Sequence, residues 1–120
     1  MTKILIIEDD EAISEALATI LKSEGHEVLE ADYHDYLAKA QSDHPDVIFL
    51  DILLKGQDGL LLCRKLKSDP KALQIPVVIM SAQPNVSHDV KAAGADDYLA
   101  KPFDMSQIYD LLTKYEKRKS

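Results

Sequence analysis

The sequence has little cysteine and no tryptophan, and acidic residues outnumber basic ones. Cys63 is the only cysteine among the 120 residues, which excludes an internal disulfide and a Cys-rich metal site. The 14 Lys and Arg stand against 21 Asp and Glu, for a net charge of −7. This balance disfavours binding to nucleic acid or to an anionic membrane, because both depend on clustered Lys and Arg.

Long hydrophobic runs are also missing. No apolar segment approaches the roughly 18–20 residues that cross a bilayer. The first residues, Met1-Thr2-Lys3, lead directly into a strand-like run instead of a signal peptide. We therefore expect a protein of the reducing cytoplasm. The length predicts one domain, residues 1–120, without room for a separate output module.

Short apolar runs alternate with helical periodicities along the chain. Continuous β-branched runs predict strands buried on both faces, and they cover residues 4–7, 47–50 and 76–80, with weaker candidates at 27–31 and 97–100. Apolar residues spaced i, i+3, i+4 predict helices between them, within 13–21, 33–40, 60–66, 86–93 and 108–115. Strict alternation predicts an α/β fold with a parallel sheet and helices on both of its faces.

The ends of the predicted strands carry chemically active residues. Residues 8–11 read Glu-Asp-Asp-Glu, Asp51 ends the third strand, Ser81 the fourth and Lys101 follows the fifth. In such sheets the site lies beyond the carboxyl ends of the strands. Clustered carboxylates need a proton or a divalent cation, and oxygen ligands suit Mg²⁺. An aspartate can attack phosphorus while an ammonium group stabilises the transferring charge. These residues suggest Mg²⁺-dependent phosphoryl transfer to Asp51.

Four segments together resemble the receiver domain of bacterial two-component response regulators over essentially the whole chain. They are IIEDDE at 6–11, VIFLDILLKGQDG at 47–59, VVIMSA at 77–82 and GADDYLAKPF at 94–103. Each segment alone is weak, but all four in this order are highly specific. The resemblance implies a flavodoxin-like, doubly wound (βα)5 fold of five parallel strands in the order 2-1-3-4-5, as in single-domain, chemotaxis-regulator-like receivers.

The resemblance also implies a role for each site residue. Asp51 looks like the phospho-acceptor, and Ser81 and Lys101 look like the groups that assist it. Four residues would be the ligands of Mg²⁺: Glu8, Asp9, Asp51 and, through its backbone carbonyl, Leu53. Ser81 and Tyr98 match the switch pair of the family, and Lys101-Pro102 resembles its cis peptide.

The implied function is a phosphorelay signal transduction switch. A histidine kinase or phosphotransfer protein would donate the phosphoryl group to Asp51. The domain would promote its own phosphorylation and dephosphorylation without being a classical enzyme. Output would pass to a downstream protein partner or through a phosphorylation-dependent homodimer, with no direct nucleic-acid or membrane binding.

The chain departs from the family pattern at two places. Lys55 stands where a proline is usual, and the stretch from Ser81 to Lys101 is shorter by a couple of residues within the predicted fourth helix. Lys55 predicts a looser loop after the acceptor, because the fixed φ of proline is lost. The shortened helix concerns the usual output surface and leaves the acceptor and the metal ligands untouched.

Blander interpretations stay open beside the leading one. Residues 8–11 alone could be a solvated turn that caps a helix, and Tyr98 a simple rim aromatic. A haloacid-dehalogenase-like phosphatase also uses a strand-end aspartate, but it usually has an acid two residues later, where this chain has Leu53. A receiver-like interaction module that takes no phosphate is the other alternative.

Three smaller expectations concern individual side chains. Cys63 is predicted to be a small core residue. Asp96 and Asp97 are expected to face solvent beside the fifth strand. Asp51→Asn is predicted to stabilise the metal-free fold, because it removes one of several crowded carboxylates.

Overall fold

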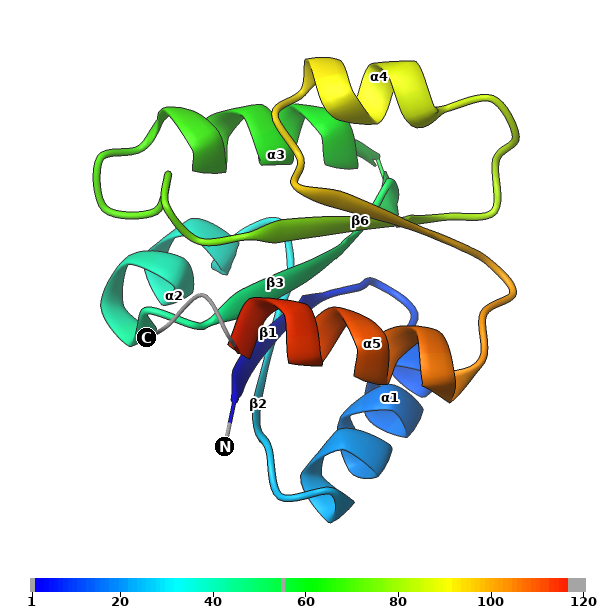
Figure 1. The fold of residues 1–120 in the computed structure, drawn as a ribbon. Coiled ribbons are helices and arrows are strands. Elements are labelled where there is room, and N and C mark those ends of the chain that lie inside the picture. Colours follow the sequence, from blue (N-terminus) through cyan, green and yellow to red (C-terminus); the bar gives the residue numbers. More distant parts are fainter. Residues whose placement is uncertain (1, 55, 117–120) are drawn as a thin grey trace.

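The computed structural model describes residues 2–54 and 56–116 (Figure 1). Along the chain the elements are β1 (Lys3–Ile7), α1 (Glu11–Ser23), β2 (Glu27–Ala31), α2 (Tyr36–Asp43), β3 (Val47–Asp51), β4 (Leu53–Leu54), β5 (Gln57–Asp58), α3 (Gly59–Ser68), β6 (Val77–Ser81), α4 (Ser87–Ala92), β7 (Asp97–Ala100) and α5 (Met105–Glu116). No helix in this part of the chain is long and apolar enough to cross a membrane.

One five-stranded sheet organises the fold. Its order is β2-β1-β3-β6-β7, with parallel pairing throughout. The predicted order 2-1-3-4-5 is therefore confirmed. The labels differ because β4 and β5, which the sequence did not predict, form a separate two-residue antiparallel hairpin after β3.

Both faces of the sheet are covered, which explains the continuous apolar runs. Every residue of β3 and β6 is buried. Residues from α2, α3 and α4 form the core on one face, and residues from α1 and α5 form the core on the other. Figure 1 shows this division, with α3 and α4 on one side of the sheet and α1 and α5 on the opposite side. Such two-sided burial requires strands that are apolar at every position.

The helix boundaries follow local capping. The carboxylate of Asp10 caps the start of α1, and Gly25 follows its end with a φ of +91°. The second helix was predicted to start at Tyr33 but starts at Tyr36. Asp32 and Asp35 hold the preceding turn, because the Asp32 carboxylate accepts from the N–H groups of His34 and Asp35. Side chains that bond to nearby backbone in this way delay a helix.

Asp96 is exposed, as expected, and Asp97 is half-buried, but both carboxylates make contacts that the sequence did not predict. The Asp96 carboxylate lies 2.6 Å from the Lys67 ammonium and also accepts from the N–H of Val77. The Asp97 carboxylate accepts from Lys114 and from the Tyr115 hydroxyl, both at 2.7 Å. These contacts connect the start of β7 to α3 and α5. The sequence did not indicate them, because the partners lie far away along the chain. The prediction for Cys63 is confirmed, because its side chain is fully buried.

Candidate functional site

Side chains from three strand ends meet at one edge of the sheet. The parallel pairing of β1 with β3, and of β3 with β6 and β7 beyond it, places their carboxyl ends together. A cavity of about 670 Å³ opens there, lined among others by Glu8, Asp9, Asp51, Leu53 and Lys101. Four acidic or basic residues predicted from the sequence thus share one cavity with the predicted carbonyl donor.

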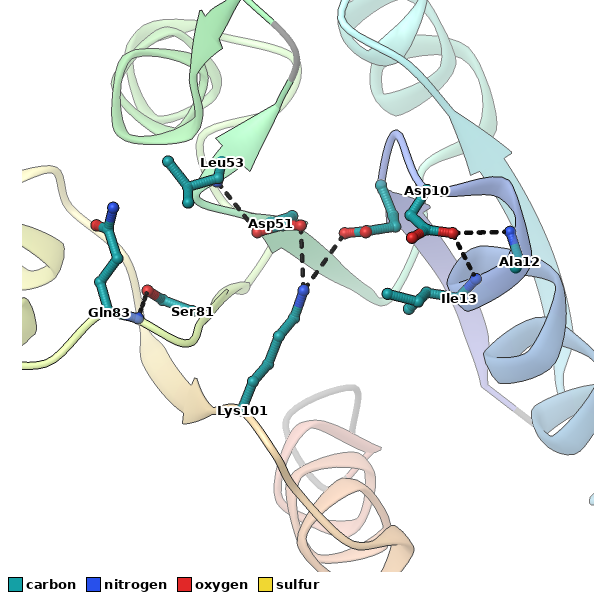
Figure 2. A network of polar contacts seen from close by, with 9 residues as sticks. Asp10, Ala12, Ile13, Asp51, Leu53, Ser81, Gln83 and Lys101 are labelled. Carbon is teal, nitrogen blue, oxygen red and sulfur yellow. Dashed lines mark hydrogen bonds and ion pairs between the residues drawn. The ribbon is translucent and has the colours of Figure 1, made fainter.

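Lys101 is the central cation of this cavity (Figure 2). Its ammonium nitrogen lies 3.1 Å from Oδ2 of Asp51 and 3.8 Å from Oε2 of Glu8. The residue sits directly after β7, where its backbone N–H donates to the carbonyl of Ser81 at 2.8 Å. The peptide bond between Lys101 and Pro102 is cis, as the resemblance implied.

Asp51 is a buried carboxylate with both oxygens engaged. Only 7% of the residue is exposed. Its Oδ1 accepts from the N–H of Leu53 at 3.1 Å, while Oδ2 faces Lys101. Backbone and ammonium donors thus orient a carboxylate that opens into the cavity, as an attacking nucleophile requires.

Glu8 and Asp51 form a tightly coupled acidic pair. Burial of Glu8, its hydrogen bond to Asp51 and the negative charge of Asp51 together raise the pKa of Glu8 to about 8. Burial alone would also raise the pKa of Asp51, but hydrogen bonds from Glu8, the Leu53 N–H and Lys101 lower it below its ordinary value. At neutral pH the pair therefore carries a proton on Glu8 and a charge on Asp51.

This proton predicts how stability depends on pH without a divalent cation. Above pH 4.5 the unfolded chain releases the Glu8 proton, while the folded protein keeps it until about pH 8. Raising the pH through this window therefore destabilises the fold. Glu8→Gln keeps a neutral hydrogen-bond donor, so it should raise the free energy of unfolding at pH 8 by about 2 kcal/mol and leave it unchanged near pH 4.

Urea unfolding at the two pH values checks this prediction. Glu15→Gln is the matched control, because Glu15 is an exposed carboxylate on α1. If both substitutions change the free energy of unfolding equally at pH 8, ionisation of Glu8 does not destabilise the fold. The earlier prediction for Asp51→Asn stays untested, and Glu8→Gln is the sharper variant because Glu8 holds the raised pKa.

The possible metal ligands at this edge of the sheet are of the chemical type that binds a magnesium ion. They are oxygen atoms only, and Oε2 of Glu8 is buried without a hydrogen-bond partner in the described structure. Carboxylates and carbonyls with open positions are what Mg²⁺ prefers. Within residues 2–54 and 56–116, no three His, Cys, Asp or Glu side chains stand in an arrangement that would hold a metal as they are. Glu8 is turned onto Asp51 and Lys101, so its carboxylate would exchange these partners for a cation.

The two predicted switch residues lie beside the cavity, not in it. Ser81 is 99% buried at the end of β6, one residue beyond Met80, which pairs with Asp51. Its Oγ accepts from the N–H of Gln83 at 2.9 Å, and the Tyr98 hydroxyl donates to the carbonyl of Gln83 at 3.4 Å. The backbone of Gln83 therefore connects Ser81 to Tyr98. Ser81 and Gln83 are drawn together in Figure 2.

Gly59 is a residue whose importance the sequence analysis missed. It starts α3, and its N–H donates to the carbonyl of Ile52 at 2.9 Å. A Cβ atom at this position would lie 2.3 Å from the backbone oxygen of Asp51 and 2.7 Å from Cα of Ile52. The helix start thus packs directly on the backbone of Asp51 and Ile52. The glycine stood at the end of the second quoted segment, 47–59, but its closeness to Asp51 depends on the hairpin between them.

Lys55 lies outside the described residues, so the predicted effect of Lys55 on the acceptor loop stays a prediction. The loop on either side of it is described. Leu53 in β4 pairs with Asp58 in β5, and the Leu53 side chain is 61% exposed. The predicted fourth helix is confirmed as a short element, six residues from Ser87 to Ala92.

Comparisons with known proteins agree on one family. A family model described as "Response regulator receiver domain" matches residues 4–113. The chain is 38% identical over 111 residues to the DNA-binding dual master transcriptional regulator RpaA of Synechocystis sp., an alignment that covers 90% of this chain and 46% of RpaA. The chain therefore spans less than half of the length of this curated relative.

Solved structures give the same result for the fold. A two-component response regulator from Clostridium difficile superposes with a TM-score of 0.89 at 29% identity, covering 100% of this chain and 99% of that one. The receiver domain of sensor histidine kinase PA1611 from Pseudomonas aeruginosa PAO1 superposes with a TM-score of 0.85 at 25% identity, covering 95% and 96%. That structure is described with a magnesium ion coordinated in the active site cleft.

Proposed function

The chain belongs to the response regulator receiver domain family, and on this premise we propose that Asp51 is its phospho-acceptor. Receiver domains are signalling phospho-acceptors that act as phosphorelay switches in two-component systems. The observation that carries the assignment is the contact of Lys101 with Asp51 at 3.1 Å inside the acidic cavity. We further propose that residues 1–120 form one such domain.

Phosphoryl transfer would begin with attack of an Asp51 oxygen on phosphorus. The new O–P bond forms as the bond from phosphorus to the donor nitrogen or oxygen breaks, and the electron pair leaves with the donor. The Leu53 N–H and Lys101 orient the carboxylate for this attack. Lys101 also lies where it can stabilise the charge on the transferring group. In this way the domain would promote its own phosphorylation and dephosphorylation.

Magnesium is the cofactor that this proposal requires. Glu8, Asp9, Asp51 and the carbonyl of Leu53 are the groups that would hold it. When bound, Mg²⁺ neutralises charge on these carboxylates and on phosphate oxygens. The proton of Glu8 would be lost on binding, because ligands must be deprotonated.

Switching would pass through Ser81, Gln83 and Tyr98. A phosphoryl group adds a charge of about −1.5 to −2 next to Asp51. If the Ser81 hydroxyl turns to donate to this group, it no longer accepts the hydrogen bond from the N–H of Gln83. The backbone of Gln83 would then move, and its carbonyl would no longer accept the hydrogen bond from Tyr98. The proposal thus connects Asp51 to the surface of α4 and β7, where Tyr98 lies in a cavity of about 330 Å³ with His88 and Lys91.

Receiver domains interact with histidine kinases and downstream effectors, and the finer choice of partner is part of this proposal. A histidine kinase or phosphotransfer protein would supply the phosphoryl group in the cytoplasm. A downstream protein, or a second phosphorylated copy, would read the surface around Tyr98. The net charge of −7 continues to disfavour direct contact with nucleic acid.

The test compares wild type with Asp51→Asn in labelling by acetyl phosphate and Mg²⁺. Intact-mass spectrometry should show one phosphoryl adduct on the wild type and none on the variant, because an amide oxygen cannot form a stable acyl phosphate. Asp58→Asn is the matched control, because Asp58 is an exposed carboxylate in the neighbouring hairpin. Undiminished labelling of Asp51→Asn would exclude Asp51 as acceptor. No labelling of the wild type would favour a receiver-like interaction module.

A further inference from the structure

Three consecutive acidic residues connect β1 to α1, and their side chains serve different places. Glu8 is buried against Asp51 and Lys101, and Asp9 is half-buried in the same cavity. Asp10 is exposed, and Figure 2 shows its carboxylate turned onto the first turn of α1. The proposed chemistry therefore uses Glu8 and Asp9 and gives no role to Asp10.

Asp10 is nevertheless held by hydrogen bonds to the helix that follows it. Toward the helix, its Oδ1 accepts from the N–H groups of Ala12 at 3.0 Å and Ile13 at 3.2 Å, and its carbonyl accepts from Ser14 at 2.9 Å. Toward the strand, Asp10 follows directly after Glu8 and Asp9, the two acids of this connection that line the cavity. One residue thus joins the start of α1 to the two acids that precede it in the cavity.

The connection between β1 and α1 is so short that a conformational change at one of its residues also displaces the others. β1 ends at Ile7 and α1 begins at Glu11, so Asp10 is one of three linking residues. Its backbone is extended, with φ −77° and ψ 104°, and this conformation is held by the capping hydrogen bonds. If the cap is lost, the backbone of Asp10 is free to rotate, and this rotation also changes the backbone positions of Glu8 and Asp9 in the same short connection.

We propose that Asp10 is a positioning residue, which by capping α1 holds the backbone of Glu8 and Asp9 so that both carboxylates face the acceptor cavity. The inference rests on the proposed function, because ligation of Mg²⁺ by Glu8 and Asp9 is what this positioning serves. Partners that orient metal ligands in other proteins commonly change metal affinity by 10- to 100-fold when removed.

The chain allows the cap to be separated from the charge. Asp10 adds a negative charge near Glu8, Asp9 and Asp51, and this charge could attract a cation without any positioning. Asp10→Ala removes both the cap and the charge. Asp10→Ser removes only the charge, because a serine hydroxyl accepts the same backbone hydrogen bonds.

Mg²⁺ titration followed by amide NMR shifts tests the proposal on the full chain. Asp10→Ala should raise the dissociation constant about 10-fold, while Asp10→Ser should stay within about twofold of wild type. Asp32→Ala is the control, because Asp32 also accepts from two backbone N–H groups, in the turn before α2. It should lower stability without changing the Mg²⁺ dissociation constant. Before Mg²⁺ is added, the amide shifts of Glu8 and Asp9 should move in Asp10→Ala and return in Asp10→Ser.

Two results would overturn the inference while leaving the proposed function intact. One is an Asp10→Ala variant that binds Mg²⁺ as tightly as wild type. The other is an Asp10→Ser variant that binds as weakly as Asp10→Ala, which would show that charge and not capping matters. A wild-type protein that binds no Mg²⁺ would contradict the proposed function itself, and the inference with it.

Discussion

Lys101→Met is expected to slow phosphoryl transfer to Asp51 by about 100-fold, the usual effect of removing one group that stabilises developing charge. The Lys101 ammonium is the cation that contacts both Asp51, at 3.1 Å, and Glu8, at 3.8 Å. Methionine has a similar length and no charge. Without the ammonium group, the pKa of Asp51 should also rise, so less of the reactive carboxylate is present. The rate of labelling by acetyl phosphate, followed by mass spectrometry, measures the loss.

Lys39→Met serves as the control for this substitution. Lys39 forms an exposed ion pair with Asp35 at 3.0 Å, on α2. Its replacement removes the same charge from the protein and should leave the labelling rate unchanged. If the two variants label equally fast, Lys101 takes no part in the transfer and its ion pair with Asp51 is purely structural.

Gly59→Ala is expected to have the second large effect, on both stability and labelling. The new methyl carbon would lie 2.3 Å from the backbone oxygen of Asp51, and no side-chain rotation can relieve a collision between backbone atoms. Either α3 or the end of β3 must move. Overpacking of this kind costs about 3 kcal/mol, and it displaces Asp51 itself. Urea unfolding and the labelling rate of the folded protein measure the two consequences.

Gly25→Ala separates collision from backbone strain. Gly25 has a φ of +91°, but nothing lies within 4 Å of the Cβ that alanine would add. The substitution should cost about 1 kcal/mol of stability through strain alone, and labelling should continue at the wild-type rate. A Gly59→Ala protein that is no less stable than Gly25→Ala would show that the α3 start yields easily.

The fold was predictable from the sequence because its determinants are local. Continuous apolar runs in β3 and β6 require burial on both faces, and their alternation with amphipathic helices allows few arrangements. Capping of a helix by residues 8–11 could also be predicted, since it depends on neighbouring residues. The start of α2 was three residues off, because two aspartates in the turn compete for the backbone.

The candidate site was predictable as a set of residues, and its internal contacts were not. Parallel strands bring their carboxyl ends together, so Glu8, Asp51 and Lys101 were expected at one edge. Their protonation depends on burial and on distances of a few ångströms, which no spacing in the sequence encodes. The same holds for the partners of Asp96 and Asp97 and for the contact of Gly59 with Asp51, because each joins segments that only the folded chain brings together.

The most direct test of the account is to locate the phosphoryl group on the wild-type chain. Borohydride reduces an aspartyl phosphate to homoserine, so reduction after labelling with acetyl phosphate and Mg²⁺ marks the acceptor permanently. Tandem mass spectrometry of the digested protein should find homoserine at residue 51. Homoserine at Asp9 or Asp58 instead, or a phosphoryl group on a histidine, would contradict the assignment of Asp51 as the phospho-acceptor.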